Sequence, residues 1–281
     1  GSGKQKVKVS ATVEQRSGDH FRVRFSWDPP EMSFVSLVDE GGLTPIPPYL
    51  EREAEKSDRE RYQTVYGRYP GSVAAPTAGL HFTAGTLDQL TEKGIERREI
   101  TLHVGAGTFV PVKEGNARNH TMHDEQVEIS LEFLEQWSNR PAELVAVGTT
   151  VTRSLESAYW LGVKILENKG PAEGMLSLSQ WEHEELPQDL SLARSLEALI
   201  GHCREHRSDR IFFSTRLMIA PGYRFRTIGG LITNFHQPGS TLLLLVAAWI
   251  GSDRSKVYHY ALDHRFRFLS YGDSSLLIPK E

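Results

Sequence analysis

Polar side chains able to move protons gather where the sequence predicts that strands end. His81 lies in the segment 76–83 ahead of a predicted helix, His103 closes a predicted strand, and His236 follows the apolar run 231–235. Because imidazole titrates near neutral pH, these histidines are candidate acid–base groups. The sequence therefore predicts proton-transfer chemistry at one end of a sheet.

The run His-Thr-Met-His-Asp-Glu at 120–125 leaves two interpretations open. His120 and His123 are three residues apart, and on a helix they share a face with a carboxylate, as metal ligands do. The following residues 126–129 alternate as a strand does, which speaks against a helix. We therefore expect an acid–base or structural role for His123, with a metal site of His120, His123 and Glu125 as the alternative.

Several segments are suited to an anionic or polar ligand. At 147–156 a strand leads through Gly148 into a predicted helix that begins with Thr149 and Thr150 and carries Arg153 one turn later. Hydroxyls, free amides and a cation at a helix start favour a phosphate or a carboxylate. The alternative is a capped helix with an internal Arg153–Glu156 pair. The spacing is not that of a P-loop.

Two further segments offer backbone groups to a ligand. Thr77 and Thr83 flank the residues ahead of the helix predicted over 84–93, with Thr83 as its cap. Gly105 and Gly107 follow the strand predicted at 99–104 and allow close approach of a ligand to the backbone, although a tight turn explains them equally well.

Cations and aromatic rings alternate near the C-terminus. Residues 265–273 read Arg-Phe-Arg-Phe-Leu-Ser-Tyr-Gly-Asp, so Arg265 and Arg267 are candidates for phosphate contacts and Tyr271 for stacking on a base. Arg224 and Arg226 form a second basic pair. Phe266 and Phe268 are equally suited to a core.

Alternating strands and helices must position these groups. Two alternating runs within 6–37 predict a β-hairpin, and a proline cluster at 45–48 marks a boundary. Beyond it, helices are predicted over 84–93, 131–139, 189–204, 240–250 and 255–264, together with a helix carrying Arg153, and strands at 99–104, 143–147, 216–220, 231–235 and 275–278. The charged segment 51–61 reads as a solvated helix face and the polar residues 163–210 as a variable excursion. The pattern is α/β.

Composition excludes several classes of protein. The chain has 281 residues, 39% of them hydrophobic, and 32 basic against 36 acidic residues give a net charge of −4, which fits neither a disordered chain nor a polycation. The single Cys203 rules out a disulfide within the chain and fits a reducing cytosol. The longest apolar run, 241–250, is about half the roughly 20 residues of a membrane span. We expect no membrane association and a cytoplasmic location.

Six motifs taken in order carry a family resemblance. They are residues 76–83, 100–109, 122–125, 147–156 with Gly-Thr-Thr, Arg153 and Glu156, 231–236 with Thr-Asn-Phe-His, and 271–273 with Tyr-Gly-Asp. In this order they resemble the S-adenosylmethionine:tRNA ribosyltransferase-isomerases of queuosine biosynthesis. The similarity extends from about residue 45 to 278.

The resemblance implies a fold and an activity. The fold is a large α/β domain, here 49–281, with a smaller β-barrel, of which 1–48 supplies an incomplete part, while a further N-terminal stretch of the family is absent. The activity moves the ribosyl group of S-adenosylmethionine, as co-substrate and without a metal, onto 7-aminomethyl-7-deazaguanine in the tRNA anticodon and gives epoxyqueuosine-tRNA. We expect a monomer. A paralogue that binds tRNA without turnover and a metal-dependent hydrolase are the alternatives.

The resemblance also assigns roles to residues. The histidines at 81, 103, 123 and 236 are the candidates for proton transfer, and Glu125 and Asp273 oppose the sulfonium or activate the acceptor amine. Thr149, Thr150 and Arg153 hold the methionine carboxylate. Further contacts to substrate are assigned to the remaining motif residues, Thr77, Thr83, Gly105, Gly107, Asn234 and Tyr271, and contacts to tRNA to Arg224, Arg226, Arg265 and Arg267. The chain departs from the family's usual pattern at Val110, Val151, Gln237 and Gly239.

Overall fold

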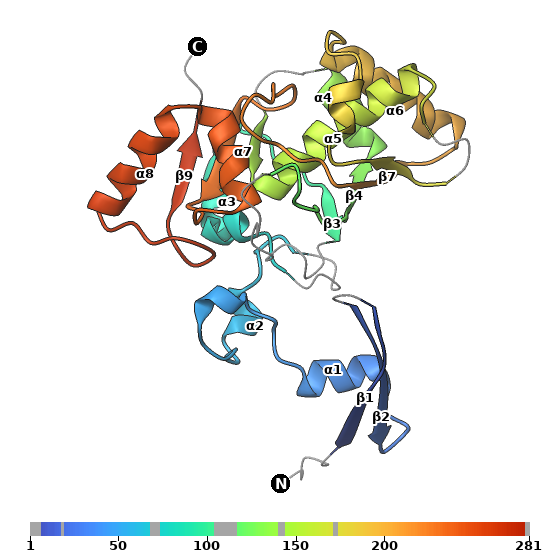
Figure 1. The fold of residues 1–281 in the computed structure, drawn as a ribbon, viewed down its shortest axis with the longest axis vertical. Coiled ribbons are helices and arrows are strands. Elements are labelled where there is room, and N and C mark those ends of the chain that lie inside the picture. Colours follow the sequence, from blue (N-terminus) through green and yellow to red (C-terminus); the bar gives the residue numbers. More distant parts are fainter. Residues whose placement is uncertain are drawn as a thin grey trace. The chain divides into compact units, whose positions relative to one another are not determined.

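The structure is a computed structural model, and it describes residues 7–17, 20–67, 74–103, 117–139, 144–170 and 174–278. The chain divides into two compact units, Gly1–Thr44 and Pro45–Glu281. The division falls at the start of the proline cluster, where rigid backbone interrupts regular structure. Figure 1 shows the order of the elements within each unit.

The first unit is a hairpin with one helix. Strands β1 (Lys8–Ser17) and β2 (His20–Asp28) pair antiparallel, with a bulge between Val13 and Gln15. Helix α1 (Phe34–Gly41) begins at Ser33, whose side chain accepts a hydrogen bond from the Ser36 amide at 3.1 Å. Phe34 of this helix contacts the rings of Phe25 and Trp27. The predicted hairpin is therefore confirmed, while the described residues of this unit form two strands and no closed barrel.

The second unit contains two sheets. One has the order β3 (Thr101–His103), β4 (Glu125–Ser130), β7 (Arg210–Thr215) and β6 (Leu176–Leu178), antiparallel except for the parallel pair β6 and β7. The other has β5 (Val145–Val147), β8 (Gly230–Asn234) and β9 (Ser274–Leu277), with β5 and β8 parallel. This mixed arrangement confirms the α/β class.

Helices supply the rest of this unit. They are α2 (Asp58–Arg61), α3 (Ala84–Glu92), α4 (Leu131–Asn139), α5 (Thr149–Leu166), α6 (Leu192–Glu205), α7 (Thr241–Ile250) and α8 (Asp253–Asp263), with the 3-10 helices η1 (Pro48–Leu50), η2 (Thr77–His81) and η4 (Glu182–Glu185). Helices α3, α4, α5, α6, α7 and α8 confirm the six predicted helices. The Thr83 side chain caps α3 as expected.

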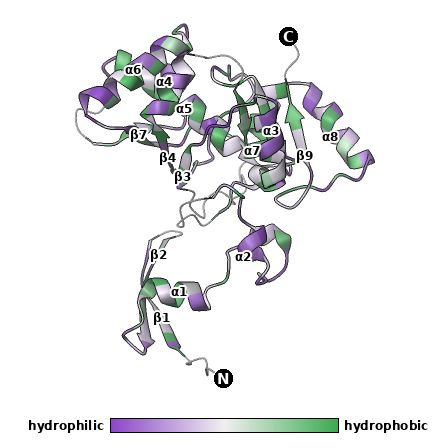
Figure 2. Ribbon diagram, turned by 180° about the vertical axis from the view of Figure 1, so that it is seen from behind, coloured by the Kyte–Doolittle hydropathy of each residue, from purple (hydrophilic) through white to green (hydrophobic). Residues whose placement is uncertain are grey.

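Helix α5 forms the centre of the core. It is buried over almost its whole length and packs against α6, whose apolar face includes Leu196 and Leu199. Figure 2 shows hydrophobic and hydrophilic residues alternating along α6, as expected for a helix with one buried face. Leu176 and Leu178 of β6 join the same core. The segment 163–210 is thus an integral part of the fold rather than an excursion from it.

Two local predictions are wrong. The strand of this region is β7 (Arg210–Thr215) and not 216–220. Leu217 and Met218 are buried but irregular, because their amides bond to the Thr215 hydroxyl and to the Gln180 carbonyl instead of a neighbouring strand. In the segment 51–61 only α2 is helical, and its Asp58 is buried rather than solvated.

Candidate functional site

The start of helix α5 lies at the carboxyl end of a parallel strand pair. Val147 of β5 pairs with Ile232 of β8, and the Gly148 amide donates to the Ile232 carbonyl at 2.8 Å. Gly148 has a φ of 103°, which a side chain would strain, and no side chain caps the helix. The amides of Thr149 and Thr150 therefore open an uncapped helix at a sheet edge, where α/β folds commonly bind ligands.

A buried carboxylate organises the next turn of this helix. Glu125 at the start of β4 is 1% exposed and accepts a hydrogen bond from Arg153 Nε at 3.1 Å, with the guanidinium also paired to it through Nη2. Its other oxygen lies 3.0 Å from His123 Nε2. Burial raises the pKa of Glu125, but the Arg153 charge and these hydrogen bonds outweigh it and leave the pKa below its usual value. Glu125 is therefore an ionised group that orients His123.

Arg153 and Glu156 do not pair with each other. Arg153 is engaged by Glu125, so holding a ligand carboxylate is not its main contact. Glu156 is fully buried and accepts hydrogen bonds from the backbone amides of Arg226 and Thr227 at 2.9 Å each, from the Thr227 hydroxyl at 2.6 Å and from Tyr223 Oη at 2.8 Å. It thereby holds the loop between β7 and β8, a role that helical spacing alone does not reveal.

A second cluster forms around Asn234 at the end of β8. Its amide nitrogen lies 3.2 Å from His81 Nε2 and donates to the Leu269 carbonyl at 2.8 Å, which joins η2 to the loop before β9. Asn234 Oδ1 is buried and accepts no hydrogen bond from the described residues. Burial lowers the pKa of His81, while the nearby Asp273 opposes that fall. The sequence motifs at 76–83 and 231–236 therefore meet here.

Asp273 and Tyr271 complete this cluster. Asp273 accepts from the Arg267 amide at 2.7 Å and pairs with its guanidinium at 3.2 Å, and these contacts lower the pKa of the carboxyl. Tyr271 Oη donates to Asp58 at 3.0 Å.

Sequence reasoning missed Asp58. Its carboxylate also binds both Nη atoms of Arg52 at 2.7 Å, and the Arg52 guanidinium holds the pKa of this carboxyl well below its usual range. From the sequence alone, the whole segment 51–61 reads as a solvated helix face. The alternating charges of this segment do not indicate that the Asp58 side chain is buried.

The remaining histidines lie apart from Glu125. His103 pairs in register with Gln126, so it projects from the face of the sheet opposite to Glu125. His236 is 8% exposed and contacts the Thr233 hydroxyl at 2.9 Å, and burial lowers its pKa to about 4. The structure therefore brings His123 and His81 to the two clusters and leaves His103 and His236 outside them.

Other predicted residues have mixed positions. Thr83 caps α3 and Thr77 lies half-buried in η2, next to Ala78, whose Cβ is 3.6 Å from where a Cβ at Gly148 would lie. Gly105 and Gly107, like Val110, lie outside the described residues. The metal alternative gains no support, since His123 and Glu125 bond to each other and the described part of the chain contains no group of three His, Cys, Asp or Glu side chains placed for a metal ion.

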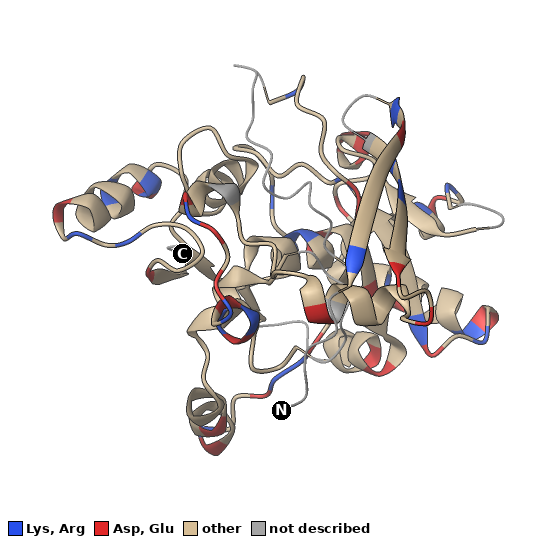
Figure 3. Cartoon of the chain, turned by 90° about the horizontal axis from the view of Figure 1, so that it is seen from below, with Lys and Arg blue, Asp and Glu red and all other residues tan. Residues whose placement is uncertain are grey.

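The predicted tRNA-contacting arginines lie in two separate loops. Arg265 and Arg224 are exposed, Arg267 holds Asp273, and Arg226 donates to Gln188 at 3.0 Å and lies over the ring of Trp160. Basic and acidic residues are interspersed along the described chain in Figure 3. Among the described residues, no helix is both long enough and apolar enough to cross a membrane.

Five of the six motifs lie in the two clusters: 147–156 and 122–125 meet through Arg153 and Glu125, while 76–83, 231–236 and 271–273 meet around Asn234. The two clusters are linked where the Gly148 amide donates to the Ile232 carbonyl of β8. A family model described as queuosine biosynthesis protein matches residues 2–277. The chain belongs to this family. The sixth motif of the family resemblance, 100–109, is described only as far as His103.

Members of the queuosine biosynthesis family are similar over nearly the whole chain. An S-adenosylmethionine:tRNA ribosyltransferase-isomerase of Xylella fastidiosa is 40% identical over 274 residues, which are 96% of this chain and 65% of that protein. The enzyme of the same name from Acidithiobacillus ferrooxidans is 39% identical, and the match covers 66% of its length. The chain therefore spans just under two thirds of these relatives. A solved structure of an S-adenosylmethionine tRNA ribosyltransferase from Thermotoga maritima is 25% identical in sequence and has a TM-score of 0.45. The match covers 96% of this chain and 62% of that chain.

Proposed function

We propose that the protein is a tRNA-modifying transferase-isomerase that moves the ribosyl group of S-adenosylmethionine onto 7-aminomethyl-7-deazaguanine in the tRNA anticodon, which gives epoxyqueuosine-tRNA. Membership in the queuosine biosynthesis family and the names of the relatives support this activity. The observation that carries it is that five family motifs form two clusters, each with a histidine and a carboxylate, linked by the hydrogen bond from the Gly148 amide to the Ile232 carbonyl. A cytoplasmic location and a monomer belong to the same proposal.

The reaction makes three chemical demands that the two clusters meet. A base removes a proton from the ribose carbon next to the sulfonium, an acid assists departure of adenine, and donors hold the methionine carboxylate. His123 is the proton-transfer group we favour, because its side chain is 22% exposed while Glu125 beneath it is 1% exposed. Glu125 and Arg153 then act as positioning residues.

The second cluster supplies the remaining groups. In the Asn234 cluster, His81 is exposed and Asp273 is half-buried. These two side chains are the candidates to assist departure of adenine and to activate the acceptor amine. The amides of Thr149 and Thr150 take the carboxylate in place of Arg153. His236 is disfavoured as the base, since it is enclosed and its pKa of about 4 makes it a weak base.

Product analysis tests the activity directly. The protein is incubated with S-adenosylmethionine and tRNA carrying the deazaguanine, and the nucleosides are analysed by mass spectrometry together with adenine release. We expect epoxyqueuosine and one adenine per transfer, and a loss of at least about 100-fold for His123→Asn, in line with a typical general acid–base contribution. The matched control is His259→Asn, an exposed histidine of α8 that bonds to its own helix. Equal rates for both variants would refute the assigned site.

A tRNA-binding protein without turnover is the second candidate function. It is favoured by the ion pair between Arg153 and Glu125, because Arg153 is then not available to bind the methionine carboxylate. Titration calorimetry with S-adenosylmethionine separates the two functions, since a pure tRNA binder gives no heat.

A further inference from the structure

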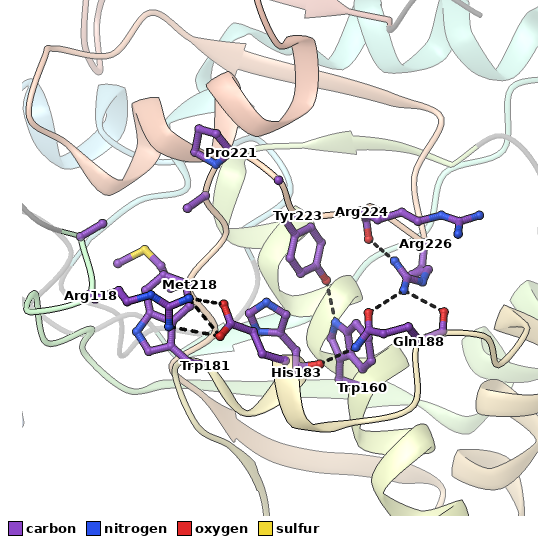
Figure 4. A pocket seen from close by; sticks show the side chains of 14 residues that line it. Arg118, Trp160, Trp181, His183, Gln188, Met218, Pro221, Tyr223, Arg224 and Arg226 are labelled. Carbon is purple, nitrogen blue, oxygen red and sulfur yellow. Dashed lines mark hydrogen bonds and ion pairs between the residues drawn. The ribbon is translucent and has the colours of Figure 1, made fainter.

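A cavity of about 540 Å³ lies beside the loop between β7 and β8, and its lining residues are not members of the two clusters. This volume lies within the range of small-molecule sites. Its lining is dominated by aromatic and cationic side chains, shown in Figure 4. They are Arg118, Trp160, Trp181, His183, Tyr223 and Arg226, with Arg224 at the rim.

Aromatic rings in tilted and edge-to-face contact form the walls of this cavity. His183 lies between three aromatic neighbours, with ring centroids 5.2 Å from Tyr223, 5.8 Å from Trp160 and 6.2 Å from Trp181. Trp160 is 1% exposed and its indole nitrogen donates to Tyr223 Oη at 2.7 Å, so the floor is rigid. A planar guest therefore meets a preorganised aromatic surface.

Two polar atoms in this wall have no partner. His183 is 8% exposed, and its Nδ1 is buried without a hydrogen bond to any described residue. The indole nitrogen of Trp181 is in the same condition. Both nitrogens have almost no accessible surface, so a ligand in the cavity contacts other atoms of these two rings. Burial lowers the pKa of His183, which keeps this ring neutral.

Arginine side chains outnumber carboxylates in the lining of the cavity. Arg118 stacks over Trp181 at 4.7 Å and forms a bidentate pair with Glu184, with distances of 2.9 and 3.1 Å. Arg224 is exposed, and its side chain makes no ion pair within the described ranges. Together with Arg226, three cations face one carboxylate, which gives 3 − 1 = +2 around the cavity. This charge favours a phosphate and opposes a sulfonium.

We propose that this cavity binds an unstacked nucleotide of the tRNA, with its base on the Arg118 guanidinium that lies over Trp181 and its phosphate at Arg224. Single-stranded RNA is commonly recognised by such stacking combined with arginine contacts to phosphate. The inference rests on the proposed function and extends it by a second RNA contact.

The cavity and the Glu125 cluster share helix α5. Arg153 and Trp160 are seven residues apart on one face of this helix, which is a rise of about 10 Å.

Nuclear magnetic resonance provides a site-specific test. Uridine 5′-monophosphate is the probe, because a pyrimidine avoids competition with the adenine of S-adenosylmethionine. The chain has five tryptophans, and the indole N–H signal of Trp181 is assigned with Trp181→Phe. We expect saturable shifts of this signal with the nucleotide, weaker shifts with uridine or inorganic phosphate, and none with S-adenosylmethionine.

Variants show whether the cavity causes the binding. Arg224→Gln is expected to weaken nucleotide binding by about tenfold, equivalent to about 1.4 kcal/mol, since it removes a charged hydrogen-bond donor to the phosphate. The control is Arg204→Gln, which removes the charge of an equally exposed arginine outside the cavity lining. No shift of the Trp181 signal, or an equal loss in the control, would overturn the proposal.

The tRNA reaction separates this inference from the proposed function. Arg224→Gln is expected to raise KM for tRNA severalfold while KM for S-adenosylmethionine and kcat stay unchanged. If nucleotide binds but no ribosyl transfer occurs, the function fails and the cavity assignment stands. If transfer occurs and the variant changes neither nucleotide binding nor KM for tRNA, the cavity assignment fails alone.

Discussion

Replacing Arg153 with methionine tests the electrostatics of the Glu125 cluster most sharply. Methionine keeps much of the volume but leaves Glu125, which is 1% exposed, without the arginine charge and with only the His123 imidazole beside it. Breaking a buried pair in this way costs about 3–5 kcal/mol. Burial then dominates, so the pKa of Glu125 rises above its unfolded value instead of lying below it.

The pH dependence follows from that reversal. In the native protein the lowered pKa contributes stability above the unfolded value of about 4.3, which is lost as pH falls through the folded pKa. Full protonation of Glu125 in the variant costs at most about 1.36 × (7 − 4.3), or about 3.7 kcal/mol at pH 7 and only about 1 kcal/mol at pH 5, because His123 still lies beside the carboxylate. The destabilisation is therefore expected to shrink by roughly 2–3 kcal/mol between pH 7 and pH 5.

Urea unfolding at both pH values measures this difference. The double variant Arg153→Met with Glu125→Gln removes the charge as well as its partner, and its stability loss is expected to be nearly the same at pH 7 and pH 5. A loss below about 1 kcal/mol for the single variant, or one that does not change with pH, would refute the argument that an uncompensated buried charge is the cause.

Three further predictions concern the same unit. Glu156→Gln is expected to lower the free energy of unfolding by about 2–3 kcal/mol in urea titrations. The glutamine N–H₂ group is a donor, and it replaces a carboxylate oxygen that accepts hydrogen bonds from Tyr223 and from the backbone amides of residues 226 and 227. A loss under about 0.5 kcal/mol would contradict this prediction. Gly79→Ala is expected to cost about 1–3 kcal/mol in thermal unfolding, since the new Cβ lies 1.9 Å from Tyr66 Oη, and Tyr66→Phe in the same chain should recover part of it. His236 is expected to titrate near pH 4 rather than 6.5 in imidazole NMR spectra, because it is buried; its stabilising contribution is lost as pH falls below the unfolded value.

The helices of this protein follow from local sequence. Thr83 ahead of α3, Ser240 ahead of α7 and the apolar periodicity of α4 and α6 are signals confined to a few neighbouring residues, and they yield the correct elements. The strand at 210–215 was missed because the apolar run that follows it carries the stronger pattern, while pairing with β4 and β6 selects the earlier residues. Strand identity depends on partners that are distant in sequence.

The contacts that define the candidate site were decided by tertiary structure. Sequence alone identified the family motifs, the histidines and the start of α5, because these depend on residue type and short spacing. The choice of Glu125 rather than Glu156 as the partner of Arg153 and the burial of Asp58 depend on which elements pack together. So does the separation of His103 from Glu125, since β3 and β4 place them on opposite faces of one sheet. Helical and strand periods fix the face on which a side chain lies, but only packing decides what that face meets.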